Sequence, residues 1–99
     1  MADLAELTAD DFAAHSGSRY LLRVAGAAEP IELELVEVTG GHGPRRGGRP
    51  FSLVFRGPRS PSLPQAQYRL EHEAMGALEI FLVPIALDPR GLCYEAVFN

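Results

Sequence analysis

Cysteine is almost absent from this chain of 99 residues, and Cys93 is the only one. A single cysteine rules out an intramolecular disulfide and a thiolate cage for a metal, and we expect it to be a small strand residue. No apolar run approaches the roughly 20 residues that a membrane-spanning helix needs. The N-terminus also lacks the basic start and long apolar run of a signal peptide. We therefore expect a cytoplasmic protein.

Long helical patterns are missing too, which excludes parallel β–α–β units because those need crossover helices. Short stretches instead show the apolar–polar alternation of β-strands. We expect strands at residues 19–25, 31–39, 51–56, 67–72, 77–85 and 92–98. Such closely spaced strands predict one mainly β domain over residues 1–99. Its fold should be a small antiparallel six-stranded barrel or a two-sheet sandwich, with one short N-terminal α-helix.

The clearest strand pair is a hairpin whose arms are residues 67–72 and 77–85, with Gly76 in the turn. Alternation along the first arm places His72 on the same buried face as its apolar neighbours. The second arm becomes apolar on both faces toward its end, which predicts that both faces are covered there. Pro84 has no N–H to donate to a sheet, so this arm should end there or lie at a sheet edge.

One short helix precedes the strands, with Thr8 as its N-cap and Gly17 as the left-handed residue that ends it. Residues 1–6 should form a loose lead-in. A helix of two turns is too short to be stable alone. We therefore expect it to dock through Leu7 and Phe12 and to plug the sheet.

Irregular positions should shape the sheet. The strand at residues 31–39 changes its alternation at Leu35 and Val36, which predicts a β-bulge or a change of packing partner. The Pro-rich segment 57–64 is long enough to carry the chain from one sheet edge to another. Residues 88–91 have the composition of a tight turn.

The segment 40–50 is rich in glycine and arginine and is the candidate partner-contact loop. A phosphate-binding loop is excluded, because that motif needs a lysine and a following helix, whereas a strand follows here. A flexible solvated loop, a loop that orders against an acidic partner and an active-site lid remain open. The side chains available for partner contact are His42, Arg45, Arg46 and Arg49.

Catalytic, cofactor and metal sites are not expected. His15, His42 and His72 have no metal-ligand spacing, and no serine has the Gly-x-Ser-x-Gly context of a nucleophile elbow. The strand carboxylates alternate with apolar residues, so they should face water and pair with strand arginines rather than converge for acid–base chemistry. The charged residues concerned are Glu32, Glu34, Glu71, Glu79 and Glu95 with Arg19, Arg23 and Arg69. We expect no enzyme, and His72 acting with a nearby glutamate is the catalytic alternative.

Two classes of function remain. A net charge of −4 argues against nucleic acid and anionic membranes as partners. Sheet edges favour a non-catalytic module that binds a protein partner or associates with itself. The alternative is a small-molecule or peptide-binding β-barrel with a cavity lined by aromatic side chains. These would be Tyr20, Phe51, Phe55, Tyr68 and Phe81.

Motifs over nearly the whole chain carry a family resemblance. They are residues 7–12, 31–38, 51–58, 63–65, 68–72, 80–84 and 94–98. With these motifs the chain resembles a family of short bacterial proteins that is described only as a domain of unknown function. The motifs are strand cores, a capped helix and turn residues, so the resemblance supplies no catalytic residues. It implies an association with phage-tail-like or tail-collar neighbours, and hence a role in a bacterial assembly.

Overall fold

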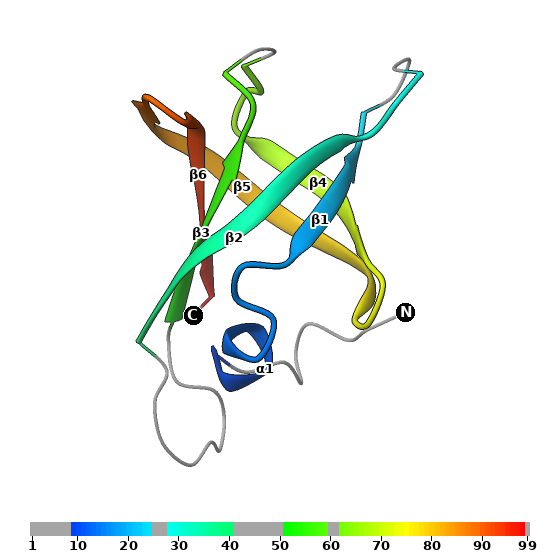
Figure 1. Ribbon diagram of the computed structural model, residues 1–99, viewed down its shortest axis with the longest axis vertical. Helices are drawn as coiled ribbons and strands as arrows, with labels where there is room; N and C mark the ends of the chain where they lie inside the picture. Colours follow the sequence, from blue (N-terminus) through cyan, green and yellow to red (C-terminus); the bar gives the residue numbers. More distant parts are fainter. Residues whose placement is uncertain (1–8, 25–27, 41–50, 60–61, 99) are drawn as a thin grey trace.

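In the part of the chain that the structure describes, six antiparallel strands close into a barrel in the order β1-β2-β3-β6-β5-β4 (Figure 1). The computed structural model describes residues 9–24, 28–40, 51–59 and 62–98. The elements are α1 (Ala9–Ala13), β1 (Arg19–Arg23), β2 (Ile31–Gly40), β3 (Phe51–Gly57), β4 (Ala66–His72), β5 (Gly76–Asp88) and β6 (Gly91–Phe98). The barrel, rather than the sandwich, is therefore the correct alternative.

Several sequence expectations lie outside the described residues. These are the lead-in at residues 1–6, the Thr8 cap, the docking of Leu7 and the contact side chains His42, Arg45, Arg46 and Arg49. Gly40, which was assigned to the loop, is the last residue of β2.

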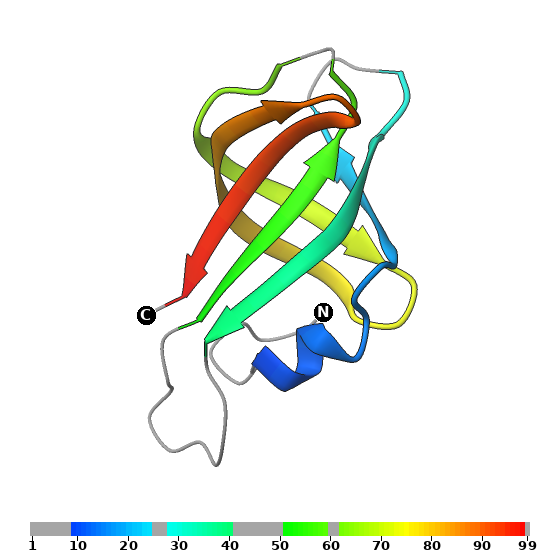
Figure 2. The same cartoon turned by 60° about the vertical axis from the view of Figure 1, so that its left-hand side comes forward.

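Two three-stranded meanders, β1–β2–β3 and β4–β5–β6, make up the barrel (Figure 2). They join along two seams, where β3 pairs with β6 and β1 pairs with β4. The Pro-rich connection after β3 carries the chain across to β4, which is not a neighbour of β3. The predicted role of that segment as a crossing between sheet edges is thus confirmed.

β2 changes its partner at a bulge. It pairs with β1 up to Glu34 and with β3 from Glu34 onward. The register against β3 shifts between Leu35 and Glu37, at the position that the change of alternation predicted. A bulge bends a strand and increases its twist, so this position is one corner at which the sheet curls into a barrel.

β5, the central strand of the second meander, bends in the same way. It pairs with β4 as far as Leu82 and with β6 from Val83, and its register shifts between Pro84 and Ala86. The strand continues to Asp88, so the expectation that it ends at Pro84 is wrong. The alternative expectation was that Pro84 lies at a sheet edge. It holds on the side of β5 that faces β4, because β4 pairs with β5 only as far as Leu82. Among the described residues, only β6 pairs with this half of β5, and a bulge tolerates a residue without an N–H.

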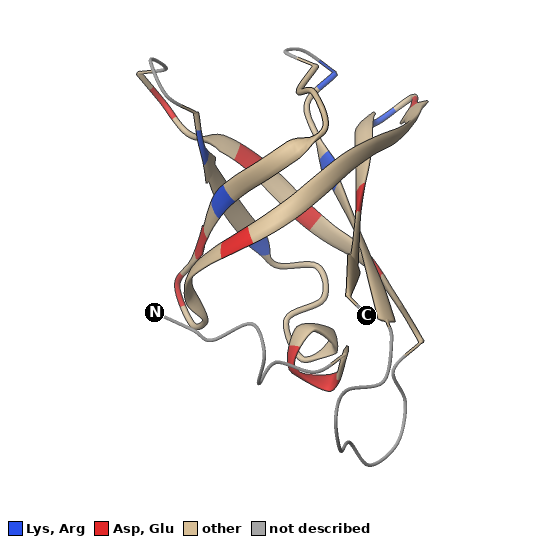
Figure 3. Ribbon diagram, turned by 180° about the vertical axis from the view of Figure 1, so that it is seen from behind, with Lys and Arg blue, Asp and Glu red and all other residues tan. Residues whose placement is uncertain are grey.

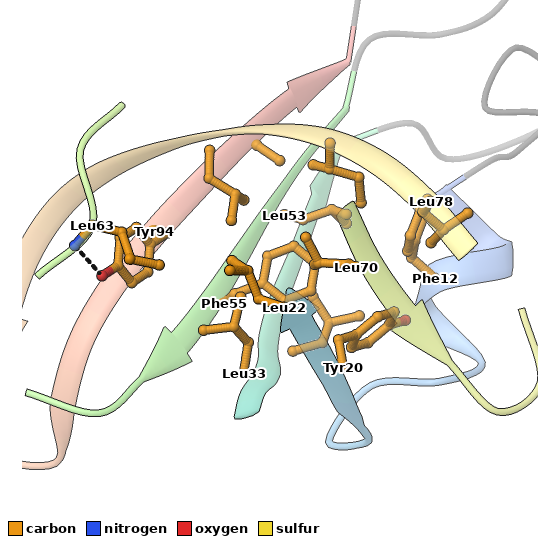
Figure 4. Close-up of a cluster of buried hydrophobic side chains, with 14 of the residues drawn as sticks. Phe12, Tyr20, Leu22, Leu33, Leu53, Phe55, Leu63, Leu70, Leu78 and Tyr94 are labelled. Carbon is orange, nitrogen blue, oxygen red and sulfur yellow. Dashed lines mark hydrogen bonds between the residues drawn. The ribbon is translucent and has the colours of Figure 1, made fainter. Parts of the chain in front are cut away.

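Side chains fill the barrel interior (Figure 4). The largest fully buried ones include Tyr20, Phe55 and Tyr94. Phe51 is also buried in this core, but Phe81 points outward and is 50% exposed. The expected cavity lined by five aromatic residues is therefore wrong for Phe81, and the other buried aromatic rings act as core filling.

α1 closes one end of the barrel. Phe12 is fully buried, and its ring centroid lies 6.0 Å from that of Phe51 and 5.7 Å from that of Phe98. A turn over residues 14–17 follows the helix and includes Gly17, whose φ of 85° is the left-handed conformation that a glycine adopts without strain. The predicted plug anchored by Phe12 is confirmed, and Gly17 has the predicted left-handed conformation, but α1 itself ends at Ala13 and not at Gly17.

The other end of the barrel is closed by the segment that leads into β4. Leu63 is buried, and its N–H donates to the hydroxyl oxygen of Tyr94 over 3.1 Å, as Figure 4 shows. This bond ties the crossing connection to the inner face of β6.

Candidate functional site

The outer surface around the seam between β1 and β4 carries paired charges. Arg19 lies 3.5 Å from Glu32, and Glu71 lies 3.0 Å from Arg23 and 3.5 Å from Arg69. Figure 3 shows acidic and basic positions interleaved along these strands. Two of the expected pairs cross between strands, Arg19 with Glu32 and Arg23 with Glu71, whereas Arg69 and Glu71 both lie in β4. Glu79 and Glu95 form no ion pair with the described residues. Each pair is solvent-exposed and contributes little to stability.

A cluster of polar rings lies beside this seam, at the turn between β4 and β5. His72 ends β4 with its side chain turned inward, and only 6% of the residue is exposed. Its ring centroid lies 4.5 Å from that of Tyr20 and 4.7 Å from that of His15. The spacing of the histidines in the sequence did not predict that His15 and His72 are in contact. The sequence did indicate that His72 points inward, because it lies on the same face of its strand as Leu70.

Hydrogen bonds fix the tautomer of His72. Its Nδ1 accepts the backbone N–H groups of Ala74 and Met75 at 3.0 and 3.1 Å. A nitrogen that accepts carries no proton, so the neutral ring holds its proton on Nε2. Nε2 lies 2.9 Å from Oγ of Ser18, and the Ser18 hydroxyl donates to the carbonyl oxygen of His15. His72 therefore donates a hydrogen bond to Ser18, and Ser18 donates one to the backbone carbonyl of His15.

This order is the reverse of that in a serine nucleophile. A catalytic imidazole must accept the serine proton, whereas here the imidazole donates to Ser18. Burial and the nearby His15 lower the pKa of His72. The cluster therefore joins the β4–β5 turn to the α1–β1 connection and does not activate Ser18.

A groove of about 700 Å³ opens over the cluster. Its lining combines the histidine cluster with charged strand residues. The residues are His15, Ser18, Arg19, Leu21, Glu32, Glu71, His72, Glu73 and Ala74. Within the described residues, no group of three or more His, Cys, Asp or Glu side chains is placed to hold a metal ion.

Asp88 shapes the turn between β5 and β6. Its Oδ1 accepts the N–H groups of Arg90 and Gly91 at 2.8 and 2.9 Å, which confirms the predicted tight turn. The Arg90 bond is the main reason why the pKa of Asp88 lies below its usual value. Cys93 lies in a strand, β6, as expected. It is buried, with Sγ 3.5 Å from Oδ2 of Asp88. Burial raises the pKa of the Cys93 thiol, so its reactive thiolate form is disfavoured.

Large apolar side chains are exposed on β5 and β6. The exposed fractions are 50% for Phe81, 49% for Ile85, 58% for Leu87 and 59% for Val97. Phe81 and Val97 alternate with buried residues and so lie on the outer face, and Ile85 is the extra residue at the bulge of β5. Leu87 is opposite buried Leu92 and so lies on the other face of the sheet, near the end of β5. We call Phe81, Ile85 and Val97 the β5–β6 surface. The prediction that the far end of β5 is covered on both faces is therefore wrong, because the outer face remains open. Residues 80–87 contain no charged side chain.

The carboxylate of Glu95 lies beside this surface. Glu95 is opposite Val83 on β5 and opposite Val54 on β3, while Val97 follows it on the same outer face. Glu95 is partly exposed and forms no ion pair or side-chain hydrogen bond with the described residues. Within the described part of the chain, the outer face of β6 thus presents a carboxylate without an ion-pair partner between apolar side chains.

Among the described residues, no helix has the length and apolarity needed to cross a membrane. Neither the curated proteins nor the solved structures contain a match to this chain. Residues 7–98 match the protein family described as Domain of unknown function (DUF6916). Since the match covers nearly all of the chain, the protein belongs to this family of domains of unknown function.

Proposed function

We propose that this domain is a non-catalytic protein-interaction module and that the β5–β6 surface is its docking site. One observation carries the proposal: three large apolar side chains, Phe81, Ile85 and Val97, lie about half exposed or more on two adjoining strands. Single exposed apolar residues are ordinary, but residues gathered on neighbouring strands mark interaction surfaces. Water leaves these side chains when a partner covers them, which favours association.

Glu95 indicates the chemistry of the partner. A carboxylate that loses water on binding needs a positive group opposite it. The proposed partner is therefore a different protein whose contact surface is apolar around an arginine or lysine. A symmetric contact between two copies through this surface would bring the two Glu95 side chains toward each other, which is unfavourable.

In this proposal the main role of the domain is not catalysis and not the binding of nucleic acid or membranes. Its support is the direction of the Ser18–His72 hydrogen bond, which is wrong for a nucleophile. Further support comes from the net charge of −4 and from strand arginines that are already paired with carboxylates.

The alternative function, a small-molecule or peptide-binding barrel, has less support. Its expected cavity would occupy the interior, where the described side chains form a packed core instead. The wider setting that we propose is a bacterial, cytoplasmic and phage-tail-like assembly. That part of the proposal rests on the sequence resemblance alone.

Partner capture with matched variants tests the docking site. The full chain is immobilised and exposed to a lysate of its source organism, beside the double variant Phe81→Ser/Val97→Ser. Gln67→Ser is the control, because Gln67 is exposed and pairs with Phe81 in the neighbouring strand β4. We expect one protein to be retained by the wild type and the control and lost with the double variant. Glu95→Lys should also abolish retention.

Circular dichroism and thermal unfolding establish that each variant is folded. Equal retention by the wild type and the folded double variant would overturn the docking site, as would the absence of any captured protein. Sedimentation velocity tests whether a second copy of the chain occupies the surface instead. A wild-type dimer that Phe81→Ser/Val97→Ser dissociates would replace the proposed partner with a second copy of the chain.

A further inference from the structure

The turn between β4 and β5 depends on one side chain. The N–H groups of Ala74 and Met75 both donate to Nδ1 of His72. Nδ1 can accept these bonds only while its lone pair is free. A proton on Nδ1 would place an N–H against two N–H donors. Both bonds therefore exist only with the neutral ring.

The same ring links the turn to a fixed part of the barrel. Its Nε2 donates to Ser18, which lies in the connection between α1 and β1. That connection is anchored to β2, because the Gly17 N–H donates to the Leu35 carbonyl over 2.8 Å and the Leu35 N–H donates to the Ser18 carbonyl over 3.2 Å. His72 is thus the bridge between a turn and an anchored segment.

The groups around the ring act on its charge in opposite directions. His15, from the α1–β1 connection, opposes a charged ring, and burial opposes it more strongly. Tyr20, from β1, stays neutral because burial raises its pKa to about 12. Glu73, from the turn itself, favours the charged ring. The inner position therefore suits the neutral form.

The groove outside suits the charged form. Carboxylates from three elements line it: Glu32 from β2, Glu71 from β4 and Glu73 from the turn. Arg19 of β1 is paired with Glu32, and Arg23 of β1 and Arg69 of β4 are paired with Glu71. An imidazolium that turns toward this groove would gain solvent and would stay near the carboxylate of Glu73, which favours the charged ring. The structure thus offers a separate favourable location for each protonation state.

We propose that His72 is a pH-operated latch: its neutral ring holds the β4–β5 turn against the α1–β1 connection, and its protonated ring releases the turn toward the groove. The release is local, because β4 and β5 remain paired from Glu71 and Ala77 to Ala66 and Leu82. The latch does not depend on the β5–β6 surface, so either proposal can fail without the other.

Amide hydrogen exchange by NMR tests the latch in the full chain. Protection of the Ala74 and Met75 amides, corrected for the intrinsic pH dependence of exchange, is measured from pH 7.5 to 5.0. We expect it to fall by up to about tenfold per pH unit once the ring begins to bind protons. Amides in the β3–β6 seam, such as that of Val54, should keep their protection.

Two variants separate titration from a merely structural role. His72→Asn supplies an amide oxygen near the position of Nδ1 and cannot titrate, so its turn amides should stay protected at pH 5.0. His15→Gln removes a neighbour that opposes protonation, so its release should occur at a higher pH than in the wild type.

The latch would be overturned by wild-type turn amides that are equally protected at both pH values. It would also be overturned if folded His72→Asn lost the same protection at pH 5.0. Should that variant fail to fold, the ring nitrogen shifts of wild-type His72 decide the question. They should show an Nε2–H tautomer at pH 7.5 that becomes imidazolium together with turn release, and a ring that stays neutral while the turn opens would refute the latch.

Discussion

At Gly91 and Gly17 a larger residue is unfavourable, for different physical reasons. A Cβ atom at Gly91 would lie 2.0 Å from the carbonyl oxygen of Gly57, whereas one at Gly17 would meet nothing within 4 Å. Gly17 instead needs its positive φ. We expect Gly91→Ala to lower the free energy of unfolding by about 3 kcal/mol because backbone must move. Gly17→Ala should cost only roughly 1–2 kcal/mol of conformational strain.

Urea unfolding followed by circular dichroism measures both changes. The order of the two variants is the test. If Gly91→Ala were no less stable than Gly17→Ala, the close approach of the β5–β6 turn to the end of β3 would be wrong.

The Tyr94 hydroxyl is a second residue with a specific energetic role. It accepts the N–H of Leu63 inside the closed end of the barrel. Tyr94→Phe would leave that buried N–H without its partner, which should cost about 1–3 kcal/mol. Tyr68→Phe is the matched control, because its hydroxyl donates to Pro64 at an exposed position, and it should cost at most about 1 kcal/mol. Similar unfolding midpoints for the two variants would contradict this assignment.

At the scale of elements, α1 depends on Phe12. Five helical residues have no independent stability, so the helix is held by contact with the rings of Phe51 and Phe98. We expect Phe12→Ala to lower the free energy of unfolding by about 3–5 kcal/mol. Phe12→Leu retains an apolar plug and should lose clearly less.

The measurement is urea unfolding of both variants, with exposure of the barrel end followed by binding of a hydrophobic dye. Phe12→Ala should bind more dye under native conditions than Phe12→Leu does. A stable Phe12→Ala protein without extra dye binding would mean that α1 is not what closes this end.

Much of the element structure could be predicted from the sequence, because strand alternation reports directly which face is buried. The change of phase at Leu35 and Val36 predicted a real bulge for this reason. The prediction made from Pro84, that the strand ends there, was wrong. A proline usually ends a strand by lacking a donor, but β5 bends at a bulge there and continues. Alternation also could not show that the apolar outer face of β5 lacks a covering layer.

The histidine cluster could not be predicted, for a different reason. His15 and His72 meet only because β1 pairs with β4 across the barrel seam. Nothing in the local pattern of either residue specifies that pairing. The inward position of His72 could be predicted, but its partners Ser18 and His15 could not.

For the whole molecule, acid should reduce stability in two separate pH ranges. The pKa of His72 is lower in the fold than its ordinary 6.5, so the unfolded chain binds this proton more readily. Its contribution is present above pH 6.5 and is lost as the pH falls below that value. The pKa of Asp88 is also lowered, from 3.8, so its contribution is present above that value and is lost as the pH falls further.

Urea midpoints at pH 7.5, 5.5, 3.5 and 2.5 separate the two ranges. We expect His72→Asn to remove the loss between pH 7.5 and 5.5 and to leave the loss at low pH. Wild-type midpoints that do not change between pH 7.5 and 5.5 would contradict a destabilising proton on His72. A similar change in the His72→Asn variant would assign the effect to other groups.

The two seams of the barrel also determine how the chain must fold. Within each meander, paired strands follow one another in sequence, but the seams join Leu21 to Glu71 and Phe51 to Phe98. Closing such long loops costs chain entropy before any seam contact repays it, so folding should take roughly milliseconds to seconds. During synthesis, β1 and β3 emerge before the strands that cover their edges. A nascent first meander therefore spends an interval with two open sheet edges, when aggregation competes with barrel closure.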